Sequence, residues 1–189
     1  MTSYRVTSGP TDEPLQLQEV KDHLKVDFSA DDTLINALIV SARQNVENYT
    51  NLALMPQTIT QKFDSFYEDT WNGLLELSVS PLIEIDSFQY KGTDGQSANF
   101  ESADYIEHSF QSPPKISLAE GKSWPTTANE DQAITVVYQA GFASADAVPK
   151  LIKQAMLLMI GHWYENRQDS VERLPKASER LLWNYRVIS

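Results

Sequence analysis

The spacing of apolar residues predicts two helices in the first third of the chain. In LQEVKDHLKV, residues 17–26, leucine and valine recur every three to four positions, as on one face of a short amphipathic helix. Between residues 29 and 51 the apolar face is longer and comprises Leu34, Ile35, Leu38, Ile39, Ala42, Val46 and Tyr49. Asp31 suits the start of this second helix, and Asn51 can adopt the left-handed conformation that ends it.

Helical periodicity returns in the last quarter of the chain, where a helix is predicted over residues 149–167. Pro149 suits its first turn, because the missing N–H has no helical partner there. One apolar face comprises Leu151, Ile152, Ala155, Met156, Met159 and Trp163. Leu157, Leu158 and Ile160 lie outside this face and make the middle of the helix apolar nearly all round. The pattern therefore predicts a helix that is buried on most sides, either inside a bundle or partly against another subunit. The candidate subunit-interface residues are Leu157, Leu158, Ile160 and Tyr164.

A final short helix is predicted in ASERLLWNYRV, residues 177–187. The polar stretch before it, NRQDSVE at residues 166–172, predicts a hinge or loop. The short helix carries more apolar surface than one helical turn can bury, and aromatic and arginine side chains dominate interface energies. The candidate docking residues are Arg180, Leu182, Trp183, Tyr185 and Arg186. The alternative, that this helix only closes the bundle, stays open.

Between the helical regions the chain changes to a pattern typical of strands. The segments QTITQKFDSFY, LLELSVSPLIEIDSFQYKGTDGQ and QAITVVYQAGF are rich in β-branched and aromatic residues in partly alternating order. KGTDGQ is a turn whose two glycines, Gly92 and Gly95, can adopt positive φ. We therefore predict an α+β fold in a single domain, residues 1–189. It has a small α-helical bundle core, about 15–56 and 146–187, with an inserted antiparallel β subdomain, about 57–140.

The composition is that of an ordinary globular protein, with 41% hydrophobic and 22% charged residues. The absence of cysteine excludes disulfides, thiolate metal sites and cysteine nucleophiles. MTSYRVTSGPTDEP lacks the apolar stretch of a signal peptide, and the longest strongly apolar run, residues 155–160, is too short to span a bilayer. We expect a soluble intracellular product with no membrane association.

The net charge of −11 is unevenly distributed. Residues 57–140 hold 13 acidic and 4 basic groups, whereas residues 141–189 hold 5 acidic and 7 basic groups. Most of the surface should repel a phosphate backbone, which disfavours tight nucleic-acid binding. The alternative function is a nucleic-acid-binding module that uses the basic C-terminal segment. Its cations are Arg167, Arg173, Lys176, Arg180 and Arg186.

The strongest catalytic candidate is the pair His162 and Glu165, three positions apart on the third predicted helix. A metal or acid–base pair is conceivable there, but the zinc pattern H-E-x-x-H is absent. A histidine near a helix C-terminus is also favoured by the helix dipole, so we favour a structural interpretation. Phosphate-loop, nucleophile-elbow and dinucleotide motifs are absent too. We predict no enzyme, and no catalytic, cofactor-binding or metal-binding residues; a hydrolase with a dispersed site is a less favoured alternative.

The order of these segments resembles a known family. The matching stretches are LQEVKDHLKVD, DDTLINALIVSARQNVENYTNLAL, SPLIEIDSFQY, ITVVYQAGF, VPKLIKQAMLLMIGHWYENR and LLWNYRV. Together they cover most of residues 15–187, in family order. The ordered set is similar to the head–tail connector, or adaptor, proteins of long-tailed bacteriophages and prophages, which are also labelled phage DNA-packaging proteins.

The resemblance implies a structural virion protein at the head–tail interface, assembled in the cytoplasm of the bacterial host. Such adaptors form a ring of about twelve subunits beneath the portal protein, extend the DNA channel, and receive a stopper or tail-completion protein. They grip the portal through terminal segments, which implies a portal-docking role for the candidate docking residues above. No cofactor is implied. An acidic β subdomain facing the channel or the next protein would let DNA pass without specific binding.

Overall fold

The computed structural model describes residues 3–66, 70–71, 73–166 and 175–187. The chain divides into two compact units. The helical unit comprises residues 10–55 and 142–187, and the β unit comprises residues 1–9, 56–141 and 188–189. Because the chain passes between the units several times, each unit is assembled from segments that are distant in the sequence.

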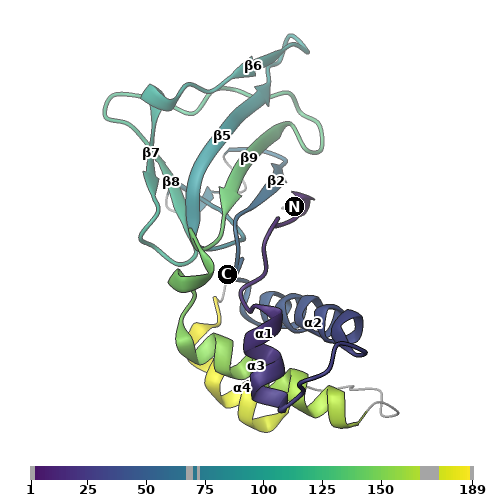
Figure 1. The fold of residues 1–189 in the computed structure, drawn as a ribbon. Coiled ribbons are helices and arrows are strands. Elements are labelled where there is room, and N and C mark those ends of the chain that lie inside the picture. The colour runs from purple at the N-terminus through teal and green to yellow at the C-terminus, as the bar shows by residue number, and fades with distance from the viewer. Residues whose placement is uncertain (1–2, 67–69, 72, 167–174, 188–189) are drawn as a thin grey trace. The chain divides into compact units, whose positions relative to one another are not determined.

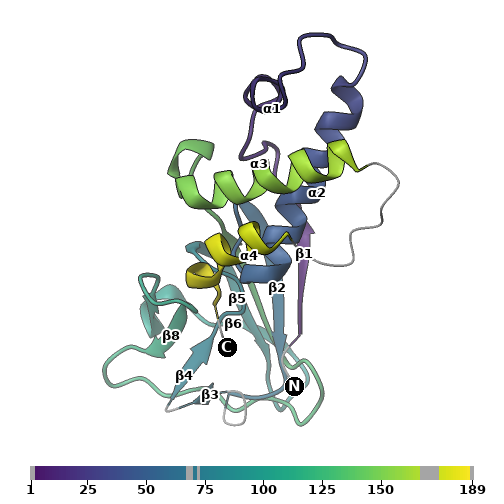
Figure 2. The same ribbon diagram turned by 90° about the horizontal axis from the view of Figure 1, so that it is seen from below.

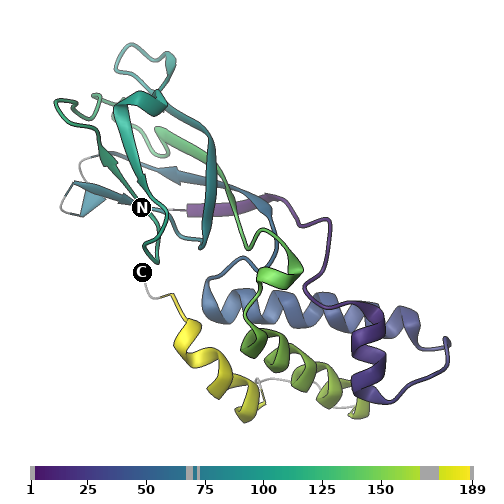
Figure 3. The same cartoon turned by 60° about the vertical axis from the view of Figure 1, so that its left-hand side comes forward.

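The described residues of the helical unit form four α-helices (Figure 1). They are α1 Leu17–Leu24, α2 Asp32–Thr50, α3 Lys150–Glu165 and α4 Lys176–Leu182, and a 3-10 turn, Trp183–Tyr185, follows the last. Helix α3 packs against both α2 and α4, as the green, blue and yellow helices of Figure 3 show. The core between them contains Ile35, Ile39, Ala42, Val46, Ile152, Ala155, Met156, Met159, Ile160 and Leu182.

Helix α2 ends at the predicted residue, Asn51, but the predicted N-terminal residue, Asp31, does not cap the helix with its side chain. Asn51 has a φ of 58°, and its backbone N–H donates to the Glu47 carbonyl, so this residue ends the helix in the left-handed conformation. Its side-chain amide also donates to the Val187 carbonyl at 3.0 Å. Asp31 occupies the N-cap position but makes no side-chain capping bond. Its carboxylate instead accepts the Tyr164 hydroxyl from the end of α3.

The β unit contains two antiparallel sheets. The five-stranded sheet has the order β1-β2-β9-β5-β6, with strands β1 Ser3–Ser8, β2 Gln57–Phe63, β9 Ile134–Ala140, β5 Leu82–Lys91 and β6 Ser97–Asn99. The four-stranded sheet has the order β3-β4-β8-β7, with strands β3 Thr70–Trp71, β4 Leu74–Glu76, β8 Lys115–Leu118 and β7 Tyr105–His108. Figure 2 shows β1, in purple, running beside β2.

Aromatic rings fill the core of the β unit. Phe66 stacks on Trp124 with 4.7 Å between ring centroids, and the cluster also includes Phe88, Phe100 and Tyr105. Such ring contacts contribute beyond the area they bury. One polar group is buried here as well, because the Tyr138 hydroxyl donates to Gln61 Oε1 at 3.0 Å and accepts from the Val79 backbone N–H.

The structure confirms the predicted α+β fold with a helical bundle and antiparallel strands. It adds strand β1, which was not predicted and which places residues 3–8 in the five-stranded sheet. The prediction of a single domain stays a prediction. In the KGTDGQ turn, Gly95 adopts a φ of 78°, but Gly92 does not use the positive-φ region. Among the helices described, none is long and apolar enough to cross a bilayer.

Candidate interaction surface

Helix α3 divides the candidate subunit-interface residues into buried and accessible ones. Ile160 is fully buried in the core of the helical unit, so its side chain is not available to another subunit. Leu157 is half-buried and packs against the same core. Leu158 is also half-buried but is not among the side chains that pack against that core. Ile160 therefore has a core role instead of the predicted interface role.

Leu151 differs from the predicted pattern in the opposite direction. The periodicity places it on the apolar face of α3, but its side chain is 49% exposed. Leu151 and Leu158 are seven residues apart, which is about two helical turns, so they lie on one side of α3. The exposed Leu151 and the half-buried Leu158 together form an apolar stripe on α3, defined here by these two residues.

Tyr164 is engaged within its own subunit. Its hydroxyl donates to Asp31 Oδ2, and its ring packs against the core of the helical unit. A phenol bonded to a carboxylate is a charge-assisted interaction, stronger than a bond between neutral groups. This bond ties the end of α3 to the start of α2. The primary role supported for Tyr164 is therefore to hold these two helices together.

The candidate docking residues at the C-terminus also divide into two groups. Leu182 is fully buried, and Tyr185 is half-buried and packs against the same core. Arg180 and Arg186 are exposed, and Trp183 is 60% exposed. Leu182 therefore closes the helical bundle, as the alternative interpretation expects. The exposed members of this group, Arg180, Trp183 and Arg186, are termed the C-terminal surface below.

Arg186 holds this surface in a defined arrangement. Its guanidinium carbon lies 5.1 Å from the centre of the Tyr49 ring and 5.4 Å from the centre of the Trp183 ring. Both distances are within the range of a cation–π interaction. The next residue, Val187, donates its backbone N–H to the Thr50 carbonyl at 2.8 Å. Arg186 and Val187 are thus held at the end of α2, with Trp183 and Arg186 left accessible.

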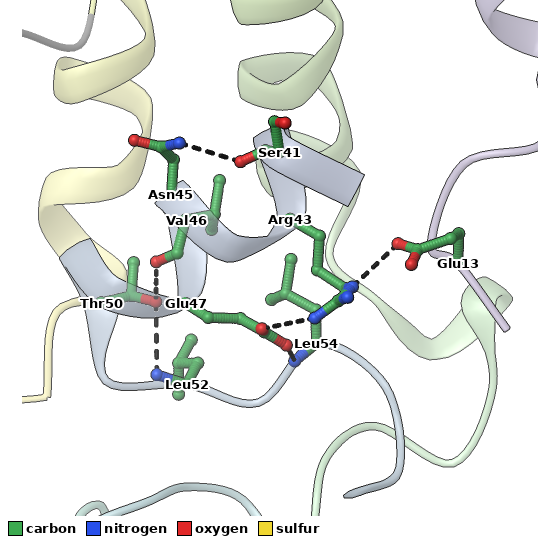
Figure 4. A network of polar contacts seen from close by, with 9 residues as sticks. All are labelled: Glu13, Ser41, Arg43, Asn45, Val46, Glu47, Thr50, Leu52 and Leu54. Atoms are coloured by element: carbon green, nitrogen blue, oxygen red, sulfur yellow. Dashed lines mark hydrogen bonds and ion pairs between the residues drawn. The ribbon is translucent and has the colours of Figure 1, made fainter. Parts of the chain in front are cut away.

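A buried ionic network holds the C-terminal half of α2 (Figure 4). Arg43, only 7% exposed, donates to Glu13 at 2.8 Å and to Glu47 at 2.7 Å. The other oxygen of Glu47 accepts the Leu54 backbone N–H at 3.0 Å. One arginine therefore connects the segment before α1, the helix α2 and the segment after it. The i, i+4 spacing of Arg43 and Glu47 is the one feature of this network that is visible in the sequence.

Burial and the neighbouring charges shift the pKa values of both Glu47 and Arg43. Burial raises the pKa of Glu47, and the lowering effects of the Leu54 N–H and of Arg43 do not fully offset it. Burial alone would lower the pKa of Arg43, but Glu13 and Glu47 raise it above its ordinary value. The guanidinium therefore remains charged and is the fixed centre of the network. This arrangement is suited to holding three segments together.

The β unit carries most of the negative charge, with 13 acidic and 5 basic side chains. Three of its lysines form ion pairs, Lys91 with Glu130, Lys115 with Glu76 and Lys122 with Asp104. Burial and the nearby Glu84 carboxylate raise the pKa of Glu107. Repulsion between Glu84 and Glu107 thus adds to the effect of burial on this carboxyl group.

Two other predicted features can be located only in part. Arg167 and Arg173 of the basic segment, and most of the predicted hinge at residues 166–172, lie outside the described residues. His162 is exposed, and its Nδ1 lies 3.4 Å from the Asn166 side-chain nitrogen. In the part of the chain that the structure describes, no group of three or more histidine, aspartate or glutamate side chains could hold a metal ion.

The family comparison covers almost the whole chain. The model of the family described as phage gp6-like head-tail connector protein matches residues 14–186. This range includes both candidate surfaces, the stripe on α3 and the C-terminal surface. No curated protein shows significant sequence similarity to the chain.

Three solved structures of a gene transfer agent particle contain a chain with the same fold. The neck of an empty gene transfer agent (GTA) particle, computed with C6 symmetry, aligns with a TM-score of 0.81 at 18% identity, covering 99% of this chain and 96% of that chain. The virion of a native GTA particle aligns with a TM-score of 0.80 at 20% identity, covering 98% and 96%. The neck of a native GTA particle, computed with C12 symmetry, aligns with a TM-score of 0.72 at 19% identity, covering 100% and 96%.

Proposed function

We propose that this chain, a member of the phage gp6-like head-tail connector family, is a structural connector at the head–tail interface of a virion. The observation that carries this proposal is the family match over residues 14–186. The likeness to neck and virion structures over 98% or more of this chain supports it. A connector works by binding its neighbours, and it needs no catalytic residues, cofactor or metal.

The connector acts as a ring of about twelve subunits, a number supported by the C12 symmetry of one similar neck structure. A closed ring needs two different surfaces on each subunit that meet head to tail. The stripe of Leu151 and Leu158 on α3 supplies one of them, because apolar side chains left accessible on a helix favour a protein partner.

The C-terminal surface contacts the portal protein. Trp183 and Arg186 are accessible residues of the types that dominate interface energies, and the contacts of Arg186 with Tyr49 and Trp183 order them before binding. Pre-ordered side chains lose less entropy on binding, so a small surface can bind with useful affinity. A stopper or tail-completion protein would then bind the ring on its opposite side.

DNA passes through the ring without specific binding. The net charge of −11, most of it in the β unit, repels phosphates, so strands slide past such a wall instead of adhering. The nucleic-acid-binding alternative depends on five cations of the C-terminal segment. Arg186, one of the five, is already engaged with two aromatic rings.

The test of portal docking is cosedimentation of the protein with purified portal particles. Trp183→Ser combined with Arg186→Ser is expected to reduce binding at least about tenfold while the melting temperature changes little, because both side chains are accessible. The matched control is Phe28→Ser combined with Lys150→Ser, which also removes one exposed aromatic and one exposed basic side chain from the helical unit.

If the control weakens portal binding as much as the C-terminal variant, the docking surface is assigned wrongly. If neither the wild type nor any variant cosediments with portal, the connector function itself is contradicted. A mobility shift of double-stranded DNA by the wild-type protein at physiological salt would favour the nucleic-acid-binding alternative instead.

A further inference from the structure

Strand β1 forms an open edge of the five-stranded sheet. It pairs with β2 on one side, and no other described strand pairs with its second side (Figure 2). All six residues, Ser3–Ser8, are exposed. An edge of this kind presents backbone N–H and C=O groups that another extended segment can bind.

The two faces of β1 have different chemistry. Tyr4 and Val6 lie opposite Gln61 and Ile59, so they share the inner face of the sheet. Gln61 and Ile59 are fully buried, whereas Tyr4 is 49% exposed and Val6 is 46% exposed. The inner face of the sheet therefore continues to its edge as accessible apolar surface.

The outer face of β1 carries positive charge. Arg5 lies opposite Thr60, and Lys62 is two residues further along β2 on the same face. Diagonal neighbours of this kind are roughly 7–8 Å apart, and like charges at such positions repel one another. Neither cation has an ion-pair partner among the residues that the structure describes.

A hollow of about 280 Å³ lies beside these side chains. Its lining residues are Ser3, Tyr4, Arg5, Thr7, Thr60, Lys62 and Gln132. Among the described residues that line it, two are cations and none is a carboxylate, although the β unit holds 13 acidic and only 5 basic side chains. The charge at this edge is therefore opposite to that of the unit around it.

We propose that the open edge of β1 binds an extended acidic segment of another protein as an additional strand. Backbone groups of β1 would supply the pairing, and alternate side chains of the bound segment would meet the two faces. Apolar side chains pack on Tyr4 and Val6, and carboxylates lie beside Arg5 and Lys62. The segment recognised is thus one that alternates between apolar and acidic residues.

The same charges disfavour a second copy of this chain as the occupant. Pairing of one β1 edge with another would bring the Arg5 and Lys62 side chains of both copies together. Like charges at paired edges are a common means by which proteins prevent self-association of their sheets. This inference concerns a peptide-binding edge and holds independently of the proposed ring and portal contacts.

The experiment measures binding of labelled peptides to the full-length protein by fluorescence anisotropy. One peptide has eight residues that alternate between valine and glutamate, and the second has the same composition in two blocks. The alternating peptide is expected to bind at least about tenfold more tightly, because only it matches both faces. Its binding should also slow hydrogen exchange of the amides of residues 3–8, which marks strand addition.

Charge reversal tests the role of the two cations. Arg5→Glu combined with Lys62→Glu is expected to weaken binding of the alternating peptide at least about tenfold, and a peptide that alternates valine with lysine should then bind instead. Lys150→Glu combined with Lys153→Glu, an equal change of charge in the helical unit, should leave binding unchanged. If the reversed variant melts early, Arg5→Gln with Lys62→Gln replaces it, with the same weakening expected.

Three results would overturn the proposal. Equal binding of the alternating and block peptides would mean that charge alone, without strand pairing, explains the affinity. Unchanged exchange of residues 3–8 in the complex would place the peptide elsewhere. Slower exchange of these amides at higher protein concentration, with no peptide present, would show that a second copy occupies the edge.

Discussion

At the scale of single residues, the helical unit depends on one buried cation. Arg43 is 7% exposed and bonds two carboxylates from different segments, Glu13 and Glu47. Replacing both partners of a buried ion pair with apolar residues often costs little stability. Removing only one partner is strongly destabilising, because it leaves an uncompensated buried charge. Substitution of the arginine alone is therefore the informative change.

Arg43→Met is expected to lower the free energy of unfolding by about 3 kcal/mol, because Glu47 would keep a buried charge without its cation. Urea denaturation followed by circular dichroism measures this. The matched control is Lys91→Met, which removes an exposed ion pair with Glu130 and should lower the free energy by no more than about 1 kcal/mol. Equal effects of the two substitutions would contradict the role assigned to Arg43.

Glu47 gives the helical unit a specific pH dependence. Its pKa is raised by burial above the ordinary value of 4.5, so the folded state binds this proton more tightly than the unfolded state. The stability contributed by that proton is complete below pH 4.5 and is lost as the pH rises through the raised pKa. Glu47→Gln should remove this pH-dependent contribution to stability. The difference between the unfolding free energies of wild type and variant should therefore change with pH from pH 4.5 upward. An unchanged pH profile would mean that the Glu47 pKa is not raised.

Tyr164 provides a third test at this scale. Tyr164→Phe removes the hydroxyl that Asp31 accepts and keeps the ring in place, so the free energy of unfolding should fall by about 1.5 kcal/mol. Assembly, measured by sedimentation velocity, should be unchanged. A variant that is as stable as the wild type but fails to assemble would show that Tyr164 acts in the subunit interface.

The sequence could predict residue types on a face, but not which of them remain accessible. Leu151 and Ile160 are both apolar residues of α3, yet one is 49% exposed and the other fully buried. Their difference depends on which sides of α3 are covered by α2 and α4, and helical periodicity carries no such information. The Glu13–Arg43 bond was invisible for the same reason, because its partners are 30 residues apart.

At the scale of elements, the accessible stripe of α3 is separable from its core face. Leu158→Asp should reduce assembly while leaving the helical unit folded, because Leu158 is half-buried. Ile160→Asp is the matched variant two residues away and should unfold the unit, at a cost of about 4 kcal/mol or more. Circular dichroism and sedimentation velocity on both variants distinguish the outcomes. If Leu158→Asp also unfolds the unit, α3 is internal and supplies no subunit contact.

The helices could be predicted better than the strands. Helices α2 and α3 have long periodic faces and recognisable end residues, and Asn51 ends α2 as its left-handed preference suggests. Strand β1 was missed because its apolar alternation is short: only Tyr4 and Val6, with Arg5 between them, mark one face of the strand. Its pairing with β2 joins residues that are 50 or more positions apart in the sequence, which no local pattern can reveal.

At the scale of the whole molecule, the two units differ in charge as well as in secondary structure. The β unit holds 13 acidic and 5 basic side chains, and the helical unit holds 13 acidic and 10 basic ones. An acidic unit that repels DNA, and a helical unit with accessible apolar and aromatic residues, together suit a protein that binds protein neighbours around a DNA path. The central claim is that this chain forms a ring on a portal.

Native mass spectrometry of the protein mixed with purified portal tests that claim most directly. The account predicts a complex whose mass corresponds to one portal and about twelve copies of this chain, as expected for a closed ring with head-to-tail contacts. Trp183→Ser with Arg186→Ser should abolish the complex without unfolding the protein. A mixture in which portal and this chain remain separate under all assembly conditions, or in which single copies bind without forming a complete ring, would contradict it.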